Sequence, residues 1–213
     1  MTLLPLFPLP NVVLFPDALL PLHIFEPRYR TMVADALDSD RHIGMVLLRA
    51  GFERDYEGRP PIFDVGCRGV IVHWVRLDDG RYNILLRGLE RFRVVAENHE
   101  RPYRRASVET LPERSLDEYG KQALTRVRRK LEDGLGLPFD APDAEGDEPA
   151  RQLSTLSDAE FLHVIAQHID LEPIEKQALL ECETLVERGR ALLELIDIRR
   201  MTSHRPPRPG STH

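Results

Sequence analysis

Residues 74–85 read Trp-Val-Arg-Leu-Asp-Asp-Gly-Arg-Tyr-Asn-Ile-Leu and carry the clearest local structural signal in the sequence. The dipeptide Asp79-Gly80 stands between two apolar-rich segments and tolerates the positive φ angles of a tight type I′ turn. The sequence therefore predicts a β-hairpin with Asp79-Gly80 as its two-residue loop. Counting outward from the loop gives the expected pairs, which are Asp78 with Arg81, Leu77 with Tyr82, Val75 with Ile84, and Trp74 with Leu85.

Other strand-like segments lie on both sides of the hairpin. Residues 3–10 are apolar but interrupted by proline, which suits an edge strand or the start of a strand rather than a central strand. Residues 43–48 are typical of a strand buried on both faces. Two more strands are expected at residues 91–97 and 105–111. Glu26-Pro27 opens a predicted helix whose inward face carries Tyr29, Met32, Val33, Ala36 and Leu37. Because several strands are apolar on both faces, the sheet is expected to curl into a small barrel.

The apolar period changes to that of a helix after Pro112. Apolar residues at helical spacing predict an amphipathic helix from Leu116 to Leu131, with Tyr119 on its inward face. Residues 134–150 are rich in Gly, Pro and acidic residues and predict a loop. Ser157 and Glu160 have the spacing of a capping box for a helix that ends near Ile169. A further helical pattern runs from Pro173 to about Arg200.

These patterns predict an α+β protein with two domains. Residues 1–112 form the β-rich domain, residues 113–202 form an α-helical subdomain, and residues 203–213 form a Pro-rich tail that is expected to be disordered.

Charge and composition exclude several classes of function. The net charge is −6, and residues 1–113 hold 15 basic and 16 acidic side chains against 14 and 19 in residues 114–213. Neither part has the basic excess that a nucleic-acid backbone requires. No apolar run reaches the ~18 residues of a membrane span. The two cysteines, Cys67 and Cys182, form no disulfide framework, so a reducing cytoplasm is the expected location.

The sequence contains no recognisable catalytic, cofactor or metal motif. The Gly120-Lys121 pair lacks the rest of a phosphate-binding loop and lies inside the predicted helix. His163 and His168 are five residues apart, about 140° around a helix, so they do not share a metal ion. Cys67 is interpreted as a small core residue rather than a nucleophile. We therefore expect a protein that is not an enzyme and binds no cofactor.

A series of spaced motifs resembles the N-terminal domain of Lon-type ATP-dependent proteases. The series begins with Leu6-Phe7-Pro8-Leu9, Val13-Leu14-Phe15-Pro16 and the segment Leu20-Pro21-Leu22-His23-Ile24-Phe25-Glu26-Pro27-Arg28-Tyr29-Arg30. It continues through Ile43-Gly44-Met45-Val46, Val65-Gly66-Cys67-Arg68-Gly69 and Asp79-Gly80-Arg81-Tyr82, and it ends with Gly88-Leu89-Glu90-Arg91-Phe92-Arg93-Val94 and Pro102-Tyr103. These motifs occur in the family's order and cover nearly all of residues 3–111.

The resemblance implies a PUA-like β pseudo-barrel followed by an α-helical subdomain. It also implies a role in substrate recognition, because catalysis in Lon proteases lies further along the chain. The sequence ends where the ATPase motor would begin, and it contains neither a phosphate loop nor a Ser-Lys protease domain. The expectation is a stand-alone member of the family that binds polypeptides.

Four residues are the candidates for peptide contact. Phe52 and Tyr56 lie in the polar loop of residues 51–61, where exposed aromatic side chains can anchor a peptide or can fold back on the barrel as a lid. Arg28 and Arg30 belong to the family-like motif, and a salt bridge that anchors the helix explains them equally well.

Three hypotheses of function follow. The first is a module that binds unfolded or tagged polypeptides, as a quality-control factor or an adaptor to an ATP-dependent protease. The second is an RNA-binding PUA-like module, for which Arg101-Pro102-Tyr103-Arg104-Arg105 supplies interleaved basic and aromatic residues. The third is a hydrolase whose site assembles only in three dimensions.

Overall fold

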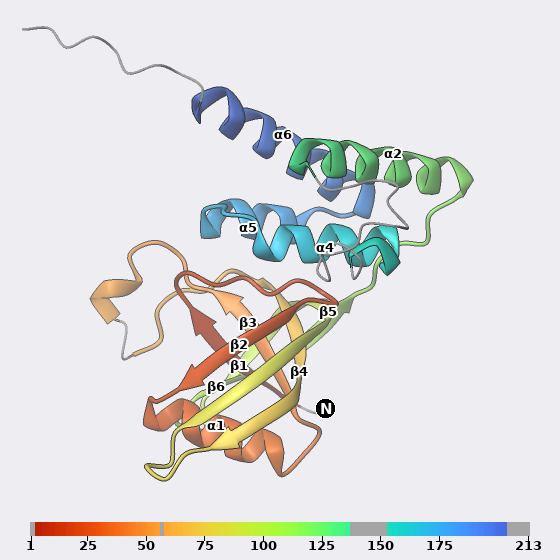
Figure 1. The fold of residues 1–213 in the computed structure, drawn as a ribbon. Helices are drawn as coiled ribbons and strands as arrows, with labels where there is room; N and C mark the ends of the chain where they lie inside the picture. Colours follow the sequence, from red (N-terminus) through yellow and green to blue (C-terminus); the bar gives the residue numbers. More distant parts are fainter. Residues whose placement is uncertain (1–2, 56–57, 137–152, 204–213) are drawn as a thin grey trace, which may run out of the picture.

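The N-terminal half folds into one six-stranded mixed sheet in the computed structural model, which describes residues 3–55, 58–136 and 153–203 (Figure 1). The strands are β1 (Leu4–Leu9), β2 (Leu19–Ile24), β3 (His42–Leu47), β4 (Val65–Arg76), β5 (Tyr82–Asn98) and β6 (Arg104–Leu111). Their order is β2-β5-β4-β3-β1-β6, and β5 also pairs with β6. This extra pairing closes β1, β3, β4, β5 and β6 into a barrel, whereas β2 has no described strand along its second edge. Strand β1 pairs with both β3 and β6, so the expectation that residues 3–10 are not a central strand was wrong.

The long strand β5 pairs with three other strands and so connects the two ends of the sheet. Its first part pairs with β2 and its last part with β6, while β4 runs along most of its other edge. The prediction of a separate strand at residues 91–97 was therefore wrong, because these residues continue the hairpin strand without a break. Register shifts between Ile71 and His73 and between Val94 and Ala96 bend the strands enough to close the barrel.

The predicted hairpin exists, but its register was wrong by one residue. The Leu77 N–H donates to the Arg81 carbonyl at 2.9 Å, so the loop holds three residues, 78–80. The observed pairs are Arg76 with Tyr82, Val75 with Asn83, and Trp74 with Ile84. Only Gly80 in this loop has a positive φ, +80°, whereas a type I′ turn requires two such residues. Asp79 accepts a hydrogen bond from the Arg81 N–H at 3.0 Å and forms the ion pair that was expected for Asp78.

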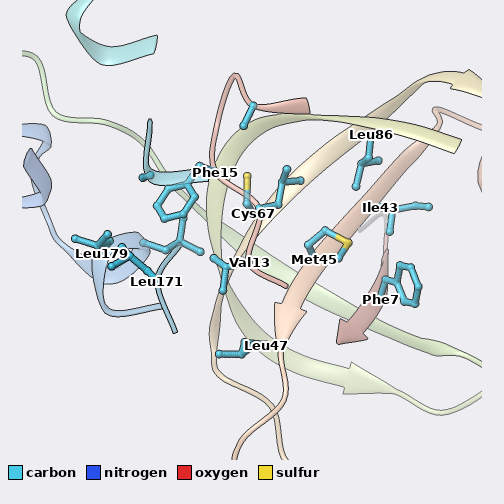
Figure 2. Packing of buried hydrophobic residues seen from close by; sticks show 14 of the residues in the cluster. Phe7, Val13, Phe15, Ile43, Met45, Leu47, Cys67, Leu86, Leu171 and Leu179 are labelled. Carbon is cyan, nitrogen blue, oxygen red and sulfur yellow. The ribbon is translucent and has the colours of Figure 1, made fainter. Parts of the chain in front are cut away.

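Helix α1 (Pro27–Leu37) closes the lower end of the barrel in Figure 1. Tyr29, Met32, Val33 and Ala36 are buried as predicted, and Leu37 is half-buried. Side chains from the strands fill the interior, and Figure 2 shows Leu171 and Leu179 of the helical part beside the barrel residues Val13 and Phe15. The apolar core is therefore continuous from the barrel into the helices.

The helices after β6 stack above the barrel (Figure 1). They include α2 (Glu118–Leu135), α4 (Asp158–His168), α5 (Pro173–Glu181) and α6 (Leu185–Ser203). The α+β class is thus confirmed, as is the Ser157–Glu160 capping box of α4. Tyr119 is 71% exposed, so its predicted inward position was wrong: it lies in the first turn of α2, near Arg126. Gly134 and Leu135 end α2 rather than open a loop.

Parts of two predicted segments lie outside the described residues. These parts are residues 137–150 of the expected loop and residues 204–213 of the expected tail.

Candidate functional site

One face of the β2–β5–β4 sheet is open to solvent, and we call it the outer sheet face. Strand alternation and the observed register place nine side chains on it in three rows. The rows are Leu19, Arg87 and Val70; then Pro21, Leu85 and His73; then His23, Asn83 and Val75. None of the nine is buried, whereas Ile84 and Leu86 on the opposite face of β5 are 4% and 0% exposed.

Apolar and uncharged groups dominate this face. Leu19 and Val75 are each 46% exposed, and Pro21 and Leu85 lie between them across the strands. Phe25 follows directly after β2, is 60% exposed, and stacks on His23 with 6.2 Å between ring centroids. Because a monomeric soluble protein rarely leaves a contiguous apolar patch uncovered, such a patch indicates a binding surface.

No described helix covers the outer sheet face. In Figure 1, α1 lies below the barrel and α2, α4, α5 and α6 lie above it, while β2, β5 and β4 form the front of the view. His23 contributes to the order of this face, since its Nδ1 lies 2.6 Å from the Asn83 Oδ1 and its Nε2 lies 3.2 Å from an Arg81 nitrogen. The face is therefore a surface of three paired strands, with an irregularity in β4 between Ile71 and His73.

Arg28 and Arg30, the predicted contact residues on α1, have different neighbours. Arg28 pairs with Glu26 at 2.9 Å and lies 4.6 Å from the Tyr29 ring centroid. Arg30 packs over the hairpin turn, where a β-carbon on Gly80 would lie 2.2 Å from its guanidinium. Arg28 thus forms a salt bridge at the start of α1, and the peptide contact expected for Arg28 and Arg30 stays a prediction.

Phe52, the aromatic candidate that the structure describes, packs elsewhere than these arginines. Phe52 is half-buried in the short 3-10 helix η1 (Phe52–Asp55) and packs against a small core cluster that includes Leu48 and Phe92. This inward packing matches the lid interpretation of the loop. Tyr56 lies outside the described residues.

The basic stretch that suggested RNA binding is paired with acidic groups. Arg104 is 8% exposed and binds Glu97 at 2.9 Å, and Arg105 binds Glu100 at 3.1 Å. Arg101 lies 3.6 Å from Asp35. A cavity of about 560 Å³ beside this stretch is lined by both signs of charge, with Tyr103 donating to Asp35 at 2.6 Å. These acidic neighbours offset the positive charge of Arg101, Arg104 and Arg105, which weakens the attraction of this stretch for a phosphate backbone.

A buried polar cluster joins the barrel to the helices, and sequence reasoning missed it. Arg188 of α6 is fully buried and donates to Glu113 at 2.8 Å and to the His163 Nε2 at 2.7 Å. Arg91 of β5 lies 3.1 Å from the same carboxylate and donates to the Cys182 carbonyl at 2.6 Å. The His163 Nδ1 lies 3.1 Å from Asp17. Opposite charges and backbone carbonyls thus compensate both buried guanidiniums.

This cluster does not have the arrangement of a hydrolase site. An arginine can only donate, so the His163 Nε2 is already occupied as an acceptor and its Nδ1 carries the proton toward Asp17. Cys67 is also fully buried, and desolvation raises the pKa of its thiol to about 12, so it is a core residue as predicted. The described residues contain no group of His, Cys, Asp and Glu that could hold a metal ion.

The buried histidine makes stability depend on pH. Burial first, with the nearby Arg188, lowers the pKa of His163 below its ordinary 6.5, despite Asp17 and Glu113. As pH falls below about 6.5, the unfolded chain binds a proton at this residue that the folded chain does not, so stability decreases. We expect the free energy of unfolding to fall between pH 7 and 5.5 with a slope of up to about 1.4 kcal/mol per pH unit.

Urea titrations at several pH values would measure this slope. His163→Gln should flatten it, and His168→Gln, at an exposed position of the same helix, should leave it unchanged. An unaltered slope in the His163→Gln protein would contradict the assignment.

No helix in the described part of the chain is long and apolar enough to cross a membrane.

Comparison with known proteins agrees with this architecture. Residues 3–197 match the family model of the ATP-dependent protease La (LON) substrate-binding domain. Lon protease 2 of Myxococcus xanthus is 31% identical over 201 residues, which cover 92% of this chain and 24% of that protein. Lon protease of Anaeromyxobacter dehalogenans is 30% identical, with 92% and 23% covered. The chain thus spans about a quarter of the length of these curated relatives.

Two solved structures share the fold. The N-terminal domain of Mycobacterium avium complex Lon protease superposes with a TM-score of 0.70 at 18% identity, covering 92% of this chain and 98% of that one. A Lon N-terminal domain protein from Xanthomonas campestris gives a TM-score of 0.57 at 22% identity, covering 97% and 100%. The resemblance predicted from the motifs is therefore confirmed, and the chain belongs to the LON substrate-binding domain family.

Proposed function

We propose that this chain binds unfolded or tagged polypeptides through the outer sheet face. The observation that carries the proposal is an apolar patch on a sheet face that no described helix covers; Leu19, Pro21, Phe25 and Val75 are exposed there, and Leu85 is half-buried. The family supports it, because its description names a substrate-binding domain of an ATP-dependent protease.

The chemistry of this face suits a polypeptide better than a nucleic acid or a small ligand. Arg87 is the one charged side chain among its nine residues, so the face lacks the charge density that a phosphate backbone requires. It is a surface of strands rather than a concave cavity of the kind that encloses small molecules. Unfolded proteins expose apolar side chains that folded proteins bury, and an apolar face selects for that difference.

Phe25 should be the largest single contributor, because it is the largest and most exposed apolar side chain at this surface. We expect Phe25→Ser to weaken binding of a permanently unfolded polypeptide, such as reduced and carboxymethylated lactalbumin, by about tenfold, which corresponds to ~1.4 kcal/mol. Fluorescence anisotropy with labelled polypeptide measures the dissociation constant.

Ile174→Ser provides the matched control for this experiment. Ile174 is 56% exposed on α5, away from the outer sheet face, so its replacement should leave binding unchanged. Equal affinities of the Phe25→Ser and parent proteins would show that the polypeptide does not bind at the outer sheet face. Absence of binding by the parent protein would remove polypeptide binding itself.

We propose further that binding serves protein quality control in the cytoplasm, with the bound polypeptide passing to an ATP-dependent protease. The support is the family, whose matched members are named Lon proteases. Purified chain added to a Lon protease from the same cell should accelerate degradation of the unfolded probe, and the Phe25→Ser protein should not. An unchanged degradation rate would remove this role and leave polypeptide binding in place.

A further inference from the structure

One edge of β2, next to the outer sheet face, carries backbone groups that pair with no described strand. Strand β2 stands at the end of the strand order and has β5 as its one strand neighbour among the described residues. The sheet closes through β5 and β6 instead, so no strand of the described part of the chain lies against the other edge of β2. An edge of this kind is a template for pairing with another extended chain.

The hydrogen-bond pattern shows which groups point outward. The Gly88 N–H donates to the Ala18 carbonyl at 2.9 Å, and antiparallel alternation then assigns Leu20, Leu22 and Ile24 to the bonds with β5. The hydrogen bond from the Leu77 N–H to the Arg81 carbonyl leads to the same pattern. In the part of β5 that pairs with β2, it makes the odd-numbered residues bond to β4 and the even-numbered residues bond to β2. The N–H and carbonyl groups of Leu19 and His23 and the carbonyl of Pro21 therefore point away from the sheet.

This edge lacks most of the features that keep edge strands from pairing with other chains. Residues 19–22 read Leu-Leu-Pro-Leu, with no lysine or other charge. Pro21 removes one outward donor, but its carbonyl remains an acceptor. Leu20 and Leu22 point toward the interior yet are half-buried, whereas their partners Leu86 and Ile84 on β5 are 0% and 4% exposed. The missing neighbour strand accounts for this residual exposure.

We infer that an extended segment of the bound polypeptide adds to the sheet as a strand beside β2. Its backbone pairs with the outward groups of Leu19, Pro21 and His23. Its alternate side chains lie beside the exposed Leu19 and Pro21 on one face and beside Leu20 and Leu22 on the other. Every polypeptide has the same backbone, so this mode recognises many unrelated apolar sequences and specifies how the proposed function operates.

A second copy of this chain fits the edge less well. In a symmetric pairing of β2 with β2 that uses the whole edge, Pro21 would face Pro21 across the two-fold axis. Each Pro21 carbonyl would then lie opposite a residue that has no N–H to donate. A segment with an ordinary residue at that position supplies the donor, so an unfolded polypeptide satisfies the edge and a second copy does not.

Backbone N-methylation of the probe tests this inference without altering the protein. The probes are a fluorescent nonapeptide of alternating valine and threonine and the same peptide N-methylated on both backbone edges, which retains every side chain but loses its donors. We expect the unmodified peptide to bind and the methylated peptide to bind at least about tenfold more weakly. Hydrogen exchange by NMR should show slower exchange of the Leu19 and His23 amides when the unmodified peptide is bound.

Each other outcome overturns one of the two proposals. Equal affinity of the two peptides, with unchanged amide exchange, would overturn strand addition and leave side-chain binding at the outer sheet face. No binding of either peptide, together with no binding of unfolded lactalbumin, would overturn the proposed function as well. Slow exchange of these two amides in a peptide-free dimer, detected by sedimentation, would identify a second copy as the occupant.

Discussion

Replacing Arg188 with methionine is expected to lower the free energy of unfolding by about 3–5 kcal/mol. The side chain is fully buried and binds the Leu179 carbonyl, Glu113 and His163. Methionine fills much of the same volume but donates no hydrogen bond. The Leu179 carbonyl and the His163 imidazole would lose a partner in buried surroundings, and the partly exposed Glu113 carboxylate would lose one of its two guanidinium partners. Breaking one member of a buried charge cluster costs more than any surface pair would.

Urea denaturation at pH 7 would measure this loss, and Arg190→Met supplies the control. Arg190 lies on the same helix but is exposed, so its replacement should change stability by no more than about 0.5 kcal/mol. Equal stability of the two variants would contradict the structural role of the cluster. A loss of helix content at low urea in the Arg188→Met protein, with the barrel still folded, would show that the cluster anchors the helical part.

Replacing Gly88 with alanine is expected to cost about 3 kcal/mol of stability. A β-carbon at this position would lie 2.0 Å from the Phe15 carbonyl oxygen and 2.9 Å from its carbonyl carbon. Backbone atoms cannot rotate away as a flexible side chain can. The same glycine exchanges backbone hydrogen bonds with Asp17 and Ala18 at the start of β2, so the strain would reach the edge proposed to bind polypeptides.

Gly134→Ala is the control for this substitution, with thermal denaturation as the readout. A β-carbon there would have its nearest neighbour, an Arg200 nitrogen, at an ordinary 3.6 Å. Alanine also has the higher helix propensity, so no loss of stability is expected at this position. A Gly88→Ala protein that melts with the parent would show that the approach of Phe15 to β5 is looser than in the structure.

Elements with a strong local signal could be predicted from the sequence. Pro27 at the start of a helix and the Ser157–Glu160 capping box depend on neighbouring residues only, and both are present. The hairpin register was missed because Asp-Gly fits two turns. The side chain of Asp79 accepts a hydrogen bond from the Arg81 N–H and stabilises the three-residue loop. The dipeptide alone does not distinguish this loop from the two-residue loop.

Features that depend on contacts between distant parts of the chain could not be predicted from the sequence. Arg188 lies in a helix with many charged residues, and its burial depends on Arg91 and Glu113, which are 97 and 75 positions away. The outer sheet face was missed for a related reason. Residues 19–22 are apolar at nearly every position, so strand alternation alone does not show which side chains face solvent. Only the pairing of β2 with β5, and of β5 with β4, defines the three rows.

Site-specific photocrosslinking tests polypeptide binding at the outer sheet face most directly. A benzoyl-phenylalanine in place of Val75 would lie on this face, and one in place of Ile174 would lie on α5 at similar exposure. With labelled unfolded lactalbumin present, we predict a strong crosslink from position 75 and only background from position 174. Equal crosslinking at the two positions, or crosslinking at position 174 alone, would show that the outer sheet face is not where the polypeptide binds.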